Sequence, residues 1–142
     1  MSSPAILQGG YVLPLSRSFT QMLLDIVAQK PPHRHPITGL TINFRDPEYS
    51  PETGGWHPVE IRLIPAGADW HLDYVTDFHY AGHPWPELEK DVDVSWTHRY
   101  TWLSRCGEIS HADARECWSL WEHNFMAYHD MGGFTVRTLW ES

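Results

Sequence analysis

The sequence has few cysteines and no long hydrophobic run, and both shortages exclude classes of protein. Two cysteines in 142 residues are too few for a disulfide-stabilised secreted domain, so we expect Cys106 and Cys117 to be reduced thiols. No apolar stretch approaches the roughly 18 residues that a transmembrane helix needs, and the first residues lack the basic start of a signal peptide. The sequence predicts a cytoplasmic protein that does not bind a membrane.

The common catalytic and nucleotide-binding signatures are also missing. The chain contains no G-x-S-x-G turn, no G-x-x-x-x-G-K-[ST] loop, no G-x-G-x-x-G turn and no H-E-x-x-H helix. These patterns mark the commonest serine hydrolases, P-loop proteins, dinucleotide-binding enzymes and zinc proteases. We therefore predict no cofactor and no bound metal. Whether the protein is an enzyme stays open, and the missing signatures favour a protein that is not one.

Basic residues are scarce, and the acidic residues are concentrated in the middle of the chain. Ten Lys and Arg stand against 18 Asp and Glu, a net charge of −8. Between Asp46 and Asp93, eleven acids accompany only Arg62 and Lys90, a local balance of −9. Such a surface repels phosphates and disfavours direct nucleic-acid binding. It favours a basic protein partner or a cation, although the acids also serve solubility alone.

What is present is enough apolar and aromatic material for one folded domain, which we place over residues 1–142. Hydrophobic residues make up 42% of the chain, with eight Trp, six Tyr and five Phe. Disordered segments are poor in such residues, and a chain of this length buries enough surface to fold without metal or disulfides.

Hydrophobic periodicity predicts the order of elements α-β-β-β-β-α-β. An N-terminal leader over 1–17 precedes a helix over 18–30, opened by a capping box of Ser18 and Gln21. Alternating segments predict strands within 37–103, a three- and four-residue apolar spacing predicts a helix over 110–131, and 134–140 reads as a last strand. The predicted fold class is α+β, with a mostly antiparallel sheet of four or five strands packed against two helices.

Three aspartates and one histidine are the candidate catalytic residues. Asp91 and Asp93 share one side of a predicted strand and would meet Asp77 if that strand pairs with the one before it. Converging carboxylates raise one another's pKa and bind a divalent cation or supply an acid–base group. His57 lies beside the long polar loop over 45–55. The alternative is that basic side chains neutralise these acids as ordinary ion pairs.

A strip of histidines and acids on the predicted strand from Trp70 to Tyr80 has a simpler interpretation. His71, Asp73, Asp77 and His79 are odd-numbered and would share one face. The pattern suits a divalent cation, but antiparallel sheets often keep one polar face in water, and we favour that reading.

Candidate binding residues lie where loops meet strands, and aromatic residues there are suited to interfaces. Arg45 and Asp46, followed by Pro47, also resemble a loop-fixing ion pair or Asx turn. The candidates are Arg45, Asp46, Trp56, Glu60, Trp85 and Glu87.

Five ordered motifs, NFRDPEYS, GGWHPVEIRL, TDFHY, ELEKDVDV and WEHNF, resemble those of a family of small bacterial proteins known only as a domain of unknown function. The resemblance spans the chain from about residue 37 onward and implies an association with mobile genetic elements. It assigns no activity. It marks as candidate site residues Asn43, Arg45, Asp46, His57, Glu60, Asp77, Glu87 and Asp93.

Two functions follow as hypotheses. The first is a non-enzymatic, self-associating module whose acidic middle and exposed Trp residues engage a protein partner. The alternative is a small-molecule or divalent-metal-dependent enzyme built on the clustered Asp and His residues.

Overall fold

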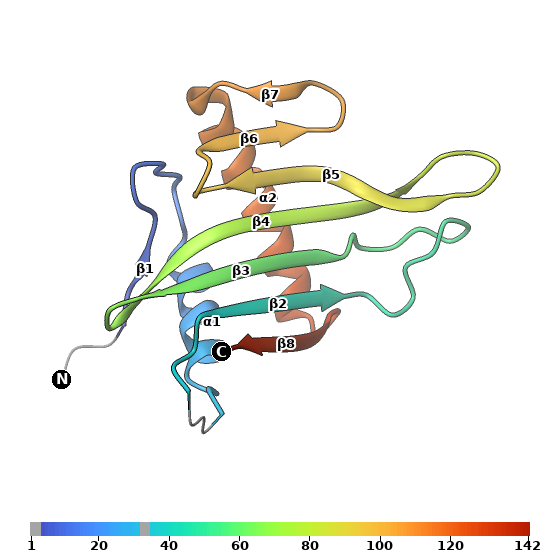
Figure 1. The fold of residues 1–142 in the computed structure, drawn as a ribbon. Helices are drawn as coiled ribbons and strands as arrows, with labels where there is room; N and C mark the ends of the chain where they lie inside the picture. The colour runs from blue at the N-terminus through green and yellow to red at the C-terminus, as the bar shows by residue number, and fades with distance from the viewer. Residues whose placement is uncertain (1–3, 32–34) are drawn as a thin grey trace.

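The computed structural model describes residues 4–31 and 35–142, which form one eight-stranded sheet with two helices (Figure 1). The sheet order is β7-β6-β5-β4-β3-β2-β8, antiparallel throughout, and β1 pairs in parallel with β4. The elements are β1 Ile6–Leu7, α1 Arg17–Val27, β2 Gly39–Arg45, β3 Val59–Ala66, β4 Asp69–Ala81, β5 Glu87–Ser95, β6 Tyr100–Leu103, β7 Gly107–Ile109, α2 His111–Asp130 and β8 Thr135–Glu141.

The α+β class with two helices and an antiparallel sheet is confirmed, but the predicted count of four or five strands is wrong. The alternating segment over 87–103, which the sequence alone does not divide, turns at 96–99, where Arg99 has φ 59°, and forms two strands, β5 and β6. The three residues of β7 and the two of β1 are too short to show an alternating pattern. Short strands of this kind are recognised only once their partners are known.

The second helix begins where the sequence predicts and the first does not. The Ser110 side chain accepts a hydrogen bond from the Asp113 amide at 3.1 Å and caps α2. In α1 the cap is Ser16, which accepts from the Phe19 amide at 3.2 Å, rather than the predicted Ser18. The helix also ends at Val27, before the predicted residue 30.

The core lies between the two helices and one face of the sheet, and the N-terminal segment contributes to it. Tyr11 and Leu13 are buried, and the Tyr11 hydroxyl lies 2.7 Å from the Thr101 hydroxyl. Tyr11 and Leu13, which the sequence places in the N-terminal leader, therefore belong to the core. Phe44 on β2 packs edge-to-face against Phe125 on α2, with ring centroids 5.1 Å apart. No helix in the described part of the chain has the length and apolar character needed to cross a membrane.

Two β-bulges change which side chains of β4 and β5 face the helices. Arg62 pairs with Tyr74 and Leu63 with Leu72, so Asp73 is an extra residue in β4. The alternation of buried and exposed side chains inverts at this bulge. Before it the even-numbered Trp70 and Leu72 are buried, and after it the odd-numbered Val75 and Asp77 are buried. In β5, Asp91 is the extra residue between Lys90 and Val92. The predicted polar strip on β4 is thereby divided between the two faces.

Candidate functional site: a pocket beneath the second helix

A pocket of about 440 Å³ opens between α2 and the strand ends that carry the acidic residues. Its polar lining consists of His57, Asp77, Asp91 and Asn124. Its apolar lining is mostly aromatic and consists of Trp56, Val59, Val92, Trp121, Phe125 and Phe134. Concave, largely apolar sites with a few convergent polar groups are typical of small-molecule binding.

The bulges bring the acidic side chains to this pocket. Asp77 pairs with Val59 on one side and Val92 on the other, and the bulge at Asp73 turns it toward α2. Asp91 belongs to the second bulge and reaches the same pocket from β5. Bulges are frequent beside functional sites because they redirect a side chain.

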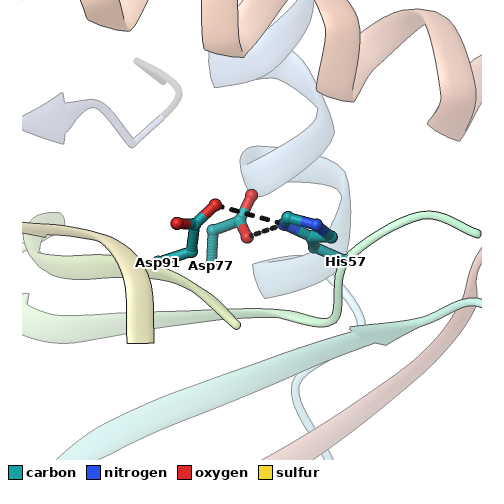
Figure 2. Close-up of side chains that lie close together, drawn as sticks. All are labelled: His57, Asp77 and Asp91. Atoms are coloured by element: carbon teal, nitrogen blue, oxygen red, sulfur yellow. Dashed lines mark hydrogen bonds and ion pairs between the residues drawn. The ribbon is translucent and has the colours of Figure 1, made fainter. Parts of the chain in front are cut away.

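Figure 2 shows the imidazole of His57 directed toward both carboxylates. His57 Nδ1 lies 2.6 Å from Asp77 Oδ1 and 3.6 Å from Asp91 Oδ2. The second oxygen of Asp77 accepts a hydrogen bond from Trp121 Nε1 at 2.8 Å. Because Nδ1 faces two carboxylates, it carries a proton, which leaves Nε2 as the nitrogen available to a ligand.

These contacts favour the charged form of His57. The hydrogen bond to Asp77 raises the pKa of the imidazole, burial lowers it, and the charges of Asp77 and Asp91 raise it further. The net effect is a pKa above the usual value. With His57 protonated, two carboxylates and one cation leave a single negative charge in the pocket.

The arrangement suits acid–base chemistry more closely than metal binding. One ligand atom from each of His57, Asp77 and Asp91 lies within 4.8 Å of the others, a spacing that a metal ion can bridge. Both oxygens of Asp77, however, already accept hydrogen bonds, from His57 and from Trp121. A metal bound to Nδ1 would have to replace the bond between His57 and Asp77, whereas proton exchange at Nε2 leaves every contact in place.

The predicted convergence is correct for Asp77, Asp91 and His57 and wrong for Asp93. Asp93 accepts hydrogen bonds from Thr76 Oγ1 at 2.8 Å and from Tyr100 at 2.7 Å on the opposite face of the sheet. The bulge at Asp91 shifts the alternation by one residue, so the two aspartates do not share a side.

Two predicted binding residues have local partners. Asp46 forms the Asx-type turn that its sequence suggests, since its side chain accepts hydrogen bonds from the Glu48 and Trp56 amides and from the Tyr128 hydroxyl. Glu60 accepts a hydrogen bond from Tyr74. Both acids therefore position neighbouring segments.

The other predicted residues lie at three separate places. Trp56 lines the pocket and stacks on Tyr128, with ring centroids 4.3 Å apart. Asn43 and Arg45 lie on β2, the latter exposed at its end. Trp85 lies in the turn between β4 and β5, Glu87 begins β5, and both are exposed.

Several pocket residues were not predicted from the sequence as a site. Trp121 falls on the apolar stripe of α2, a position typical of core residues, and periodicity does not reveal where an indole N–H points. Asn124 lies in the WEHNF motif, which assigns it no role, and Phe134 begins the predicted last strand. His79 lies at the edge of the group formed by His57, Asp77 and Asp91, with its Nδ1 3.8 Å from Asp91 Oδ1. It is therefore placed beside the pocket, although the sequence favoured a polar strand face in water.

Residues 17–138 match the family model described as a protein of unknown function, DUF2787. The chain belongs to this family. The five motifs therefore identified it correctly, and the family has no assigned activity. None of the curated proteins matches the sequence.

Two solved structures resemble this DUF2787 protein over most of its length. A hypothetical protein from the VSP-II pathogenicity island of Vibrio cholerae is 32% identical, with a TM-score of 0.78 over 89% of this chain and 95% of that one. A conserved hypothetical protein from the pathogenicity island VPI-2 of Vibrio cholerae is 35% identical, with a TM-score of 0.77 and the same coverage. The latter is described as sharing structural homology with the human P32 protein.

Proposed function

We propose that this DUF2787 protein binds a small organic molecule that carries a positive charge, in the pocket beneath α2. The observation that carries the proposal is the presence of two carboxylates and only one histidine among aromatic walls. The pocket volume of about 440 Å³ suits a small molecule.

The charges and the walls favour a cation over a neutral or anionic ligand. Asp91 Oδ2 has His57 Nδ1 at 3.6 Å, too long for a hydrogen bond, so it can accept one from a ligand. Trp56 and Trp121 offer aromatic surface, which attracts ammonium and guanidinium groups. The net charge of −8 also draws cations toward the protein.

An enzymatic role of this same pocket would depend on His57. Asp77 orients the imidazole, Trp121 holds Asp77, and Nε2 of the charged ring is left to donate a proton to a bound ligand and to take it back. This is the acid–base form of the alternative that the sequence suggests.

Calorimetric titration with phenethylammonium chloride and with 2-phenylethanol, its neutral counterpart, tests the proposal. We expect the cation to bind at least tenfold more tightly, and Asp91→Asn to remove the difference. Glu116→Gln is the matched control, because it deletes an exposed acid of α2 outside the pocket. Equal affinity for the two probes, absence of binding, or an equal effect of both variants would overturn the proposal.

A protein-binding role is the second candidate, favoured by Trp85. This residue is 83% exposed at the turn between β4 and β5, and Glu87 and Glu89 follow it. An exposed Trp beside acids suits a partner with basic and apolar side chains. We expect a labelled peptide of alternating Lys and Leu to bind in a salt-sensitive way and to lose affinity with Trp85→Ala. Retention of affinity by that variant would contradict this candidate.

A further inference from the structure

Strand β8 is an edge strand whose outer side has no neighbouring strand in the described part of the chain (Figure 1). Residues 135–139 are all exposed, although the whole strand pairs with β2. Leu139 is 62% exposed and Val136 is 38% exposed. An unpaired edge presents free backbone N–H and C=O groups to another strand.

Strand β8 has few of the features that normally protect a sheet edge from pairing with another strand. The strand has seven residues and contains no Pro and no Gly, and its register with β2 runs without a bulge. Arg137 is its one charged residue before Glu141. The opposite edge, β7, has only three residues and carries a central Glu108. Proteins normally shorten, charge or distort an edge that stays exposed, so β8 is the edge suited to pairing.

We propose that two copies of the chain associate through β8. The two strands run antiparallel about a twofold axis perpendicular to the sheet, with Thr138 opposite Thr138 of the partner copy. The two sheets then continue into one another, with all four helices on the same face. This inference does not depend on the ligand proposed above.

The cross-strand pairs in this register are favourable. On the helix side, Val136 lies opposite Trp140 of the partner copy, a β-branched and aromatic pair, and two Thr138 side chains meet at the centre. On the other side, Arg137 lies opposite Leu139 of the partner copy, and its diagonal neighbours are Arg137 and Glu141 of the partner copy. A register centred on Arg137 would instead place two guanidinium groups face to face.

A groove beside β8 supports a partner on this side. It has a volume of about 560 Å³ and lies between α1, the end of α2 and β8. Met22, Ile26 and Met126 lie along it, together with Val136 and Thr138 of the strand. Pairing at β8 brings apolar side chains of the second copy to the open side of this groove, where burial of apolar surface favours association.

Sedimentation equilibrium of the full chain across a concentration series tests the association. We expect wild-type protein to approach twice the chain mass of 16.5 kDa. Leu139→Lys puts a lysine opposite Arg137 of the partner copy and should weaken the dimer at least tenfold, while the exposed position leaves the fold intact. Adding Arg137→Glu to that variant should restore the dimer. Leu120→Lys, at a 66% exposed position on α2, is the matched control and should have no effect.

The register has its own test. Thr138→Cys in a Cys106→Ser background should form a disulfide-linked dimer on mild oxidation, since directly opposed residues of paired strands are within disulfide reach. Leu120→Cys in the same background should not. A wild-type protein that stays monomeric, a dimer insensitive to Leu139→Lys, or equal cross-linking of both cysteine variants would overturn the inference.

Discussion

Replacing Asp77 by Asn tests the acid–base arrangement directly, because the two side chains have nearly the same shape. Trp121 Nε1 can only donate, so the amide oxygen of Asn must turn toward it and the amide nitrogen toward His57. His57 then has to accept through Nδ1, and its proton moves to Nε2. We expect the pKa of His57 to fall below its wild-type value, since the hydrogen bond to the carboxylate that raises it is gone.

The Asp77→Asn substitution should also lower the free energy of unfolding, by an amount that depends on pH. A hydrogen bond to a charged group contributes about 1.5–3 kcal/mol. The His57 side chain is 34% exposed, so solvent screening reduces the expected loss to about 1–2 kcal/mol at pH 6. Because the folded-state pKa of His57 is raised, the extra stability is complete below about pH 6.5 and disappears as the pH rises through that folded-state value. The loss should therefore be smaller at pH 9.

Two assays measure these effects. Histidine ¹⁵N NMR titration reports the pKa and tautomer of His57, and urea denaturation between pH 6 and pH 9 reports the free energy of unfolding. Glu116→Gln serves as the control, since it removes an exposed acid from α2 and should change neither quantity. An unchanged pKa for His57 in the Asp77→Asn protein, or a loss of stability that grows toward pH 9, would refute the reasoning.

Three further substitutions have defined outcomes. Trp121→Phe keeps an aromatic wall but removes the donor to Asp77, so urea denaturation should show a loss of about 1–2 kcal/mol; no loss would mean that the bond contributes nothing. Asp93→Asn should lower the pKa of Tyr100, which the Asp93 hydrogen bond raises to about 12, in a tyrosine NMR titration. An equal fall in the pKa of His57 in the Asp93→Asn protein would contradict the placement of Asp93 on the opposite face of the sheet. Phe44→Ala removes a fully buried ring and should cost about 3–5 kcal/mol in denaturation, where a loss below about 1 kcal/mol would contradict its core position.

The sequence predicts long, strongly patterned elements well and short ones poorly. The apolar spacing from Ala114 to Phe125 identifies α2, and the Ser110 cap fixes its start, because both signals lie within one element. The strands β1 and β7 were missed, and β6 was not separated from β5, since two to four residues carry no periodicity.

For the candidate site, the sequence determined which residue types were available and near which strands. The sequence alone reveals the clustered acids, a histidine beside a long loop and a helix rich in Trp. The tertiary structure decided which of them meet. A one-residue slip exchanges the two faces of a strand, and a bulge introduces that slip only when two strands pair. The bulges at Asp73 and Asp91 therefore brought Asp77 and Asp91 together beneath Trp121 and left Asp93 on the other face.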